Sequence, residues 1–486
     1  MNVPLRLLIS ALSAVALVLG GVALERMGPN PVSAGGREEP ISGAWSCPHG
    51  GGEGWKVWVT VTNPGPEPVE ARITTSAGGA ATPPSSSVIP PSTLQYFEIA
   101  APIAGSATVV EYLGGTVGVG SVVVPPEGGL AAEPCVSSPG SAWSLPEAST
   151  LRGETANLVV HNPFAAQAVV DVILTAGEQQ IRPGNLQGIV LGPLDARAFE
   201  LNRFALGQRA LTGTVIAVQG RVAVATVVVS TGGIRSALGV PEPATRWLLP
   251  GVGEETDIVV RALPENDAPV SAEIHGQEGP IPALDLEAVA AGTAEAFGVL
   301  TAQGGLVVRS DGPRPMVAGR RMVLEPSMVP APAKPEEPGN GNGNRAKGEG
   351  PKGKAGSDRK GGKKGGGSGG KEEEPPPAPE ADIAATAGVT ATADRWLVPP
   401  AAGPEGQPSI LLLQNPGETE VTVSVTLLGT GGPLANTSQV TVPPRTTIRV
   451  PVEGGPATAL VEGGGVVAAQ ATLAAGAFAV LLGVPI

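Results

Sequence analysis

A short pattern that recurs four times constrains the fold of this chain more than any other feature. Each copy has a tryptophan followed three residues later by a proline, at Trp45, Trp143, Trp247 and Trp396. In three copies a strand-like run further along ends in Asn-Pro, at Asn63, Asn162 and Asn415. The first three copies begin roughly 100 residues apart, the usual size of a β-sandwich domain. Such repetition predicts one folding unit per copy.

The residues inside each copy favour strands. Residues 421–427 alternate apolar and hydroxyl side chains, as in a sheet with one buried and one wet face. Pro-Pro corners follow at Pro90 and Pro443, and Gly-containing hairpins close the copies. We therefore expect an all-β fold of four tandem antiparallel β-sandwich repeats, immunoglobulin-like or fibronectin-like, after an N-terminal transmembrane or signal helix.

Composition divides the chain into seven parts. We predict a signal-anchor or signal peptide at 1–26, a spacer at 27–40, repeats at 41–138, 139–243 and 244–329, a disordered Gly/Pro/Lys-rich linker at 330–391, and a fourth repeat at 392–486. The linker has too little apolar surface to offset its ordering entropy. We expect it to separate the fourth repeat from the first three. Its basic charge leaves an anion-binding tail as the alternative to a solvated linker.

The N-terminus indicates export. Residues 7–24 are apolar and uncharged, and Glu25 and Arg26 follow. This run is short for a membrane span and long for the core of a signal peptide. We expect a single-pass membrane anchor with the rest of the chain outside the cytoplasm. The alternative is cleavage and secretion.

The two cysteines bracket the first repeat. Cys47 lies in the Trp-x-x-Pro stretch, where the other copies have Leu145, Leu249 and Val398, and Cys135 lies at the far end of the repeat. Disulfides form in exported proteins. We therefore predict a Cys47–Cys135 disulfide, with two separate buried thiols as the alternative.

The tryptophans fall into two groups. The repeat-start residues Trp45, Trp143, Trp247 and Trp396 are interpreted as structural plugs over the ends of the sandwiches. Trp55 and Trp58 occur only in the first repeat and are candidates for stacking against a ligand, although Trp58 alternates with valines.

Motifs for chemistry are missing from the sequence. The three histidines, His49, His161 and His275, lie in different repeats and have no metal-ligand spacing. No nucleophile elbow, phosphate-binding loop or carboxylate pair is evident. The net charge of −13 argues against nucleic acid as a partner. We expect neither an enzyme nor a bound cofactor or metal.

Together, the apolar N-terminus, the Trp-x-x-Pro stretches, the Asn-Pro turns and the closing hairpins resemble an actinobacterial family of exported envelope proteins of unknown function, DUF5719. The resemblance covers 41–486 apart from the linker, and its third copy lacks the Asn. It implies a membrane-anchored extracytoplasmic protein and supplies no active site. We expect a non-enzymatic scaffold of the cell envelope with a structural or adhesive role, contacting wall polymer or envelope proteins. The alternative is an accessory protein that binds cell-wall polysaccharide.

Overall fold

Each recurring tryptophan lies on or beside the strand that opens a pair of antiparallel sheets. The structure is a computed structural model that describes residues 42–231, 233–253, 255–301, 304–324, 382–434, 437–474 and 476–486. Within these ranges the only helical elements are two 3-10 turns, η1 (Gly184–Leu186) and η2 (Leu201–Arg203). The expectation of an all-β chain with antiparallel sheets is confirmed.

The first repeat sets the strand order. Its strands are β1 (Ser42–Cys47), β2 (Lys56–Asn63), β3 (Val69–Ala77), β4 (Ala80–Ala81), β5 (Ser85–Ile89), β6 (Thr93–Glu98), β7 (Ala107–Leu113), β8 (Gly118–Val124) and β9 (Ala131–Pro134). One sheet has the order β1-β7-β3-β4, with β5 also on β3. The other has the order β6-β2-β8-β9. The chain therefore crosses repeatedly between the two sheets.

The second repeat has the same order in nine strands. They are β10 (Ala142–Ala148), β11 (Thr155–Asn162), β12 (Ala168–Ala176), β13 (Gln179–Ile181), β14 (Ile189–Leu191), β15 (Asp195–Glu200), β16 (Leu211–Gln219), β17 (Ala223–Ser230) and β18 (Gly233–Leu238). Its sheets run β10-β16-β12-β13, with β14 also on β12, and β15-β11-β17-β18.

The third repeat is built alike. Its strands are β19 (Arg246–Leu249), β20 (Glu255–Ala262), β21 (Val270–His275), β22 (Pro280–Asp285), β23 (Ala294–Leu300), β24 (Gly305–Ser310), β25 (Met316–Leu324) and β26 (Asp382–Ala387). They form sheets of order β19-β24-β21-β22 and β23-β20-β25-β26.

In the fourth repeat one long strand joins the two sheets. The strands are β27 (Ala393–Val398), β28 (Ser409–Asn415), β29 (Val421–Gly429), β30 (Gly432–Pro433), β31 (Ser438–Val442), β32 (Thr446–Val452), β33 (Thr458–Ala474), β34 (Ala477–Leu482) and β35 (Val484–Pro485). The first part of β33 pairs with β27 and β29, and its second part pairs with β28 and β34.

The predicted linker ends too late in the sequence. β26 pairs with β25 from Gly319 opposite Ala387 to Leu324 opposite Asp382, and Val389 then bridges to Leu248. The predicted linker end at 391 is therefore wrong, because 382–389 completes the third repeat. The apolar run of β26 is the missing half of its closing hairpin. The rest of the predicted linker, at 330–381, lies outside the described residues, as do the predicted anchor and spacer at 1–40.

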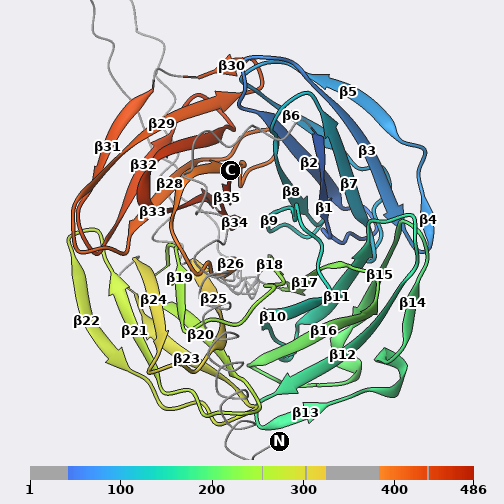
Figure 1. The fold of residues 1–486 in the computed structure, drawn as a ribbon, viewed down its shortest axis with the longest axis vertical. Helices are drawn as coiled ribbons and strands as arrows, with labels where there is room; N and C mark the ends of the chain where they lie inside the picture. The colour runs from blue at the N-terminus through green and yellow to red at the C-terminus, as the bar shows by residue number, and fades with distance from the viewer. Residues whose placement is uncertain are drawn as a thin grey trace, which may run out of the picture. The chain divides into compact units, whose positions relative to one another are not determined.

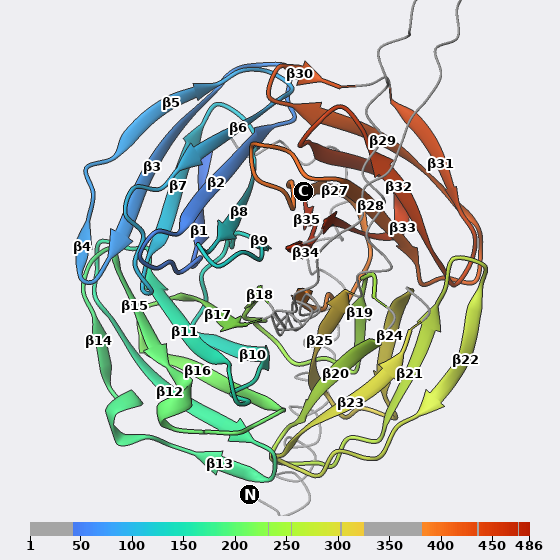
Figure 2. The ribbon, with the colours of Figure 1, turned by 180° about the vertical axis from the view of Figure 1, so that it is seen from behind.

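The four repeats follow one another around a ring within the compact unit Ser42–Ile486 (Figures 1 and 2). The innermost strands β9, β18, β26 and β34 pack against one another at its centre. The fourth repeat closes the ring on the first: the Thr62 and Thr458 hydroxyls lie 2.5 Å apart, and the Tyr96 hydroxyl donates to Ala402 O at 2.9 Å. The expectation that the fourth repeat stands apart from the first three is therefore wrong.

The ring has two distinct faces. The first residue of β1 pairs with Leu113, and so does Glu70, the second residue of β3. The first residue of β3 pairs with the last residue of β5, Ile89. The end of β2 lies at this same end of the sheets, because the Asn63 amide donates to Ile89 O. We call this end, where the opening strand of each repeat starts, the opening face. Leu324 and Asp382 pair at the other end of the sheets, beyond the start of β20.

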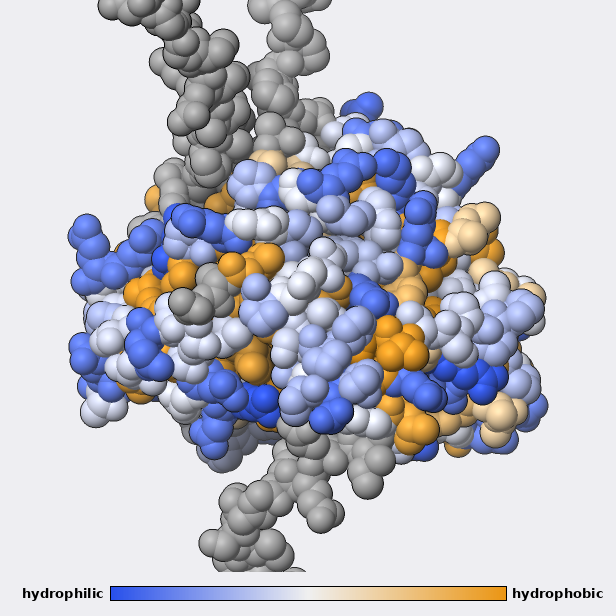
Figure 3. Space-filling view, turned by 90° about the horizontal axis from the view of Figure 1, so that it is seen from above, coloured by the Kyte–Doolittle hydropathy of each residue, from blue (hydrophilic) through white to orange (hydrophobic). Residues whose placement is uncertain are grey.

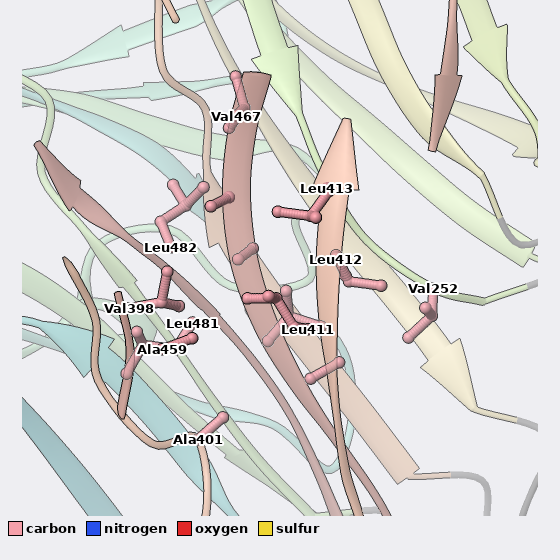
Figure 4. Close-up of a cluster of buried hydrophobic side chains, with 14 of the residues drawn as sticks. Val252, Val398, Ala401, Leu411, Leu412, Leu413, Ala459, Val467, Leu481 and Leu482 are labelled. Carbon is pink, nitrogen blue, oxygen red and sulfur yellow. The ribbon is translucent and has the colours of Figure 1, made fainter. Parts of the chain in front are cut away.

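The apolar core continues from repeat to repeat. One cluster joins Leu411, Leu412 and Leu413 of β28 to Val252 of the third repeat and Trp58 of the first, and Figure 4 shows Leu412 beside Val252. Burial of this kind is the main stabilising term in folding. The rim above β5 and β30, in contrast, shows separate apolar patches among polar side chains (Figure 3). The core is thus shared by neighbouring repeats.

Candidate functional site

The four repeat-start tryptophans form part of the core. Trp45, Trp143, Trp247 and Trp396 are between 1 and 5 % exposed. Three of their indole N–H groups donate to backbone oxygens, those of Val222, Met316 and Val466, over 2.7 to 3.0 Å. The Trp45 indole nitrogen is buried without a partner. None of these rings is open to a ligand.

Beside each tryptophan, two facing positions hold different residues in the first repeat from those in the later repeats. In the later repeats an aliphatic residue follows the tryptophan by two positions, and a glycine precedes the last bridge of the repeat. Gly388 lies against Leu249 and the Trp247 ring, and Gly483 against Val398 and the Trp396 ring. In the first repeat these two places hold Cys47 and Cys135, and the structure joins them in a disulfide. A covalent bond therefore replaces a glycine contact.

Trp58 is not available for stacking. It is 8 % exposed, packs in the core shared with the fourth repeat, and has Gly403 beside its ring. Its interpretation as a ligand-stacking residue is therefore wrong, because a repeat distant in sequence covers it. Trp55 is half-buried against the core of the first repeat and keeps part of its surface exposed.

The Asn-Pro turns and Pro-Pro corners belong to one structure. Asn63 donates to the carbonyls of Glu67, Ile89 and Pro90, and its side-chain oxygen accepts from the Gly65 N–H at 2.9 Å. Asn162 and Asn415 repeat this arrangement. Since buried polar groups need partners, these asparagines are structural. They tie the turn after the second strand to the corner before the sixth.

The residue before this asparagine, or before Ala262 in the third repeat, reaches the preceding repeat around the ring. The four residues are Thr62, His161, Arg261 and Gln414. Each one hydrogen-bonds across a boundary between repeats, to Thr458, Ser46, Ser144 and Leu306 O respectively. One strand position thus makes the polar contact at all four boundaries, with four different side chains.

The boundary between the first and second repeats buries two histidines, His161 at this position and His49. The Ser46 hydroxyl and His161 Nδ1 lie 2.7 Å apart, and His49 Nε2 lies 2.9 Å from the Thr108 hydroxyl. Burial lowers the pKa of His49 to about 4, and burial together with the charge of His49 lowers the pKa of His161 to about 3. Both rings are neutral near pH 7. Ser46 and His161 are almost fully buried, so this hydrogen-bonded pair is closed to substrates.

Glu133 lies near the same boundary. Burial raises its pKa well above the usual range, against hydrogen bonds from Leu238 N–H and the Ser236 hydroxyl. The Ser236 contact measures 3.5 Å. The carboxyl group lies in a small pocket that His49 also lines. This boundary thus buries two neutral histidines and a carboxyl group whose pKa is raised.

The boundary between the second and third repeats is charged instead. Arg235 is fully buried and bonds Glu147 at 3.3 Å and Glu154 at 3.0 Å. Arg321 from the third repeat bonds Glu147 at 3.5 Å and also pairs with Asp257. Arg209 completes the network on the exposed side of Asp257, and three arginines there balance three carboxylates.

The charges of this network move the pKa values of its acids. Burial alone would raise the pKa of Glu154, but Arg235 and the Ser149 hydroxyl lower it overall. Asp257 behaves likewise, its pKa lowered by Arg209 and Arg321 against its burial. A pocket of about 380 Å³ lies next to Asp257, and Leu300 and Gly298 also line it. Arg209, Arg321 and Asp257 of its lining are paired with one another, whereas Glu255 adds a negative charge to it.

Sequence reasoning missed both of these boundaries. Their members are scattered, so no local motif marked them. The one available signal was the position before the Asn-Pro turn, or before Ala262 in the third copy, which is occupied by a polar residue in every copy. In the part of the chain that the structure describes, no three His, Cys, Asp or Glu side chains are grouped so that they could hold a metal ion. No helix among those residues is long and apolar enough to cross a membrane.

A family model described as a family of unknown function, DUF5719, matches residues 116–326 and 381–473, more than half of the 486 residues. The match starts at the eighth strand of the first repeat and resumes where β26 begins. It therefore includes the strand that completes the third repeat. No curated protein matches the chain.

Proposed function

This chain belongs to the DUF5719 family of unknown function, and we propose that it is a non-enzymatic scaffold of the cell envelope. It would be held at the membrane by its N-terminal apolar segment, 7–24, and would present the ring outside the cytoplasm. Its role would be structural or adhesive, through contacts with wall polymer or other envelope proteins.

The observation that carries this proposal is the way the polar side chains are used. At all four boundaries they bond a neighbouring repeat, and the charged ones are paired across the second boundary. Such contacts favour a rigid ring over a reactive cleft. The Cys47–Cys135 disulfide supports an oxidising location.

Fractionation of cells that express the full chain tests the location. We expect the protein in the membrane fraction, with an intact mass that includes residues 1–26 and is two hydrogen atoms lighter than the dithiol form. The matched control replaces Leu17 and Leu19 with arginines, which should release the protein from the membrane if the apolar run anchors it. Recovery of the unaltered chain in the cytosol with free thiols would reject the proposal.

We also interpret each repeat as a β-sandwich of the immunoglobulin-like class. Its two antiparallel sheets carry about the number of strands such domains have, and an apolar core lies between them. The connections alternate between the sheets more often than simple hairpins would. A backbone comparison of one repeat with known sandwiches by strand order would decide this class.

The accessory role in polysaccharide binding now depends on Trp55 alone. Its ring is only half-buried, and this is the observation that favours the second function. Retention on purified wall polysaccharide should then be lost in Trp55→Ala and kept in Arg152→Ala, a change at an exposed turn. Equal retention of both variants, or none of the unaltered protein, would reject it.

A further inference from the structure

Two arginines face each other across strands of the third repeat. Arg246 of β19 lies directly opposite Arg309 of β24. Like charges in this relation destabilise a sheet. The corresponding pairs in the other repeats are Ala44–Glu111, Ala142–Ile216 and Arg395–Glu462. Among these four pairs, the third repeat has the one pair of like charges, whereas the fourth repeat has an ion pair of 3.1 Å at the same place.

A third arginine comes from the next repeat. Arg445 follows the Pro-Pro corner of the fourth repeat and has a φ of 53°. Its Nε donates to a carboxylate oxygen of Glu273 at 2.6 Å, and His275 Nε2 lies 3.2 Å from the same oxygen. Glu418 is 3.9 Å from Arg445 and largely exposed. The one buried carboxylate at this place is therefore already engaged.

The first two arginines keep unused donors. Arg246 Nη2 donates to Pro416 O at 3.3 Å, but its Nε is buried without a partner. Arg309 is exposed, and in the described parts of the chain its side chain makes no hydrogen bond or ion pair. Burial and the charge of Arg309 lower the pKa of Arg246, against the opposing effect of Glu273. Positive charge is thus concentrated here without enough negative charge to balance it.

We propose that Arg246 and Arg309, assisted by Arg445, bind an oxyanion on the opening face where the third and fourth repeats meet. Guanidinium groups present paired N–H donors that match phosphate and carboxylate oxygens. A phosphate group suits the site best, because its charge offsets the Arg246–Arg309 repulsion. The phosphate could belong to a free ion or to a phosphodiester polymer of the envelope. This site is independent of whether the N-terminal segment is a membrane anchor.

Thermal unfolding of the full chain in detergent at pH 7 tests the site. The probes are inorganic phosphate, glycerophosphodiester and glucuronate, each compared with chloride at equal ionic strength. We expect phosphate to raise the Tm of the unaltered protein in a saturable way. A stronger response to the diester would identify a polymer, and a response to phosphate alone would identify the free ion.

The decisive variant is Arg309→Glu, which copies the Arg395–Glu462 arrangement of the fourth repeat. It should fold with an unchanged or higher Tm in chloride and lose the anion response. The control Arg152→Glu makes the same charge change at an exposed turn and should keep the response. The proposal is overturned if Arg309→Glu responds like the unaltered protein, if Arg152→Glu loses the response equally, or if no probe shifts the Tm of the unaltered protein.

Discussion

The boundary between the first and second repeats, called here the first boundary, is built from neutral polar groups. The boundary between the second and third repeats, the second boundary, is built from charged groups. Between the first and second repeats, neutral His49 and His161 are buried beside hydroxyl groups. The Cys47–Cys135 disulfide packs in the same cluster as Val159 and Val227 of the second repeat. Between the second and third repeats, balanced arginines and carboxylates occupy the corresponding space. The same backbone arrangement therefore accommodates different side chains at a boundary. We expect the two boundaries to lose stability under different solution conditions.

The largest effect should come from breaking the charged boundary. Glu147→Gln removes the carboxylate that Arg235 and Arg321 share, leaving two buried cations short of a partner. Removing one member of such a network costs about 3–5 kcal/mol of unfolding free energy. Denaturant unfolding would measure it. The matched control Glu200→Gln breaks an exposed pair with Arg203 and should cost less than about 1 kcal/mol. Similar losses of unfolding free energy in both variants would show that the buried network stabilises the protein no more than an exposed ion pair does.

A somewhat smaller loss of stability should follow removal of the Cys47–Cys135 disulfide of the first repeat. Cys47→Ala with Cys135→Ala opens a loop between residues 88 apart and should cost about 2–4 kcal/mol. Cys47→Leu with Cys135→Gly rebuilds the pattern of the second and third repeats and should recover part of that loss. Urea midpoints of the two double variants make the comparison. If the Leu/Gly pair is no better than the Ala pair, the two arrangements are not equivalent.

Acid should separate the two boundaries. The pKa values of His49 and His161 fall from 6.5 to about 4 and about 3 on folding, so the unfolded chain binds their protons more readily. Their stabilising contribution is complete above pH 6.5 and is lost as the pH falls toward 4, on the order of 1 kcal/mol per pH unit for each ring. Glu133, with its raised pKa, opposes this trend: it favours folding at low pH and loses its contribution as the pH rises above 4.5.

The measurement is the urea midpoint between pH 7.5 and 4.5 for the unaltered chain and for His161→Gln, which copies Gln414 of the fourth repeat. The variant should lose less stability on acidification. Glu154 and Asp257 have lowered pKa values, so the second boundary should weaken only as the pH falls below about 4.5. Identical pH profiles for both proteins would contradict the assignment of the acid sensitivity to the first boundary.

Features that depend on residues close in sequence or on the repeats could be predicted, whereas features that depend on long-range packing could not. Cys47 and Cys135 could be paired from sequence because repetition showed which positions had changed. The Asn-Pro turns were visible because their residues are neighbours. Trp58 is buried in a core shared with the fourth repeat, and the third repeat is completed by β26 from beyond a long insertion, so no window of sequence contains either relation. The Arg246–Arg309 pair likewise needs the strand register, since each arginine alone looks like an ordinary surface residue.

The smallest effect concerns the corner that all four repeats share. Ser92, Leu194 and Arg445 have φ values from 50° to 53°, whereas the third repeat places Gly292, with φ of 73°, at the same corner. A residue with a side chain in this left-handed region is destabilised by roughly 1–2 kcal/mol. Substitution by glycine removes this strain, but the greater conformational freedom of glycine in the unfolded chain offsets part of the stabilisation. Ser92→Gly should therefore stabilise the first repeat by about 0.5–1 kcal/mol, seen as a higher urea midpoint. Ser87→Gly, on the neighbouring strand β5, is the control and should destabilise, because glycine weakens a strand. Loss of stability in Ser92→Gly would mean that the Ser92 side chain contributes more than its backbone strain costs, and that the corner of the first repeat differs from that of the third.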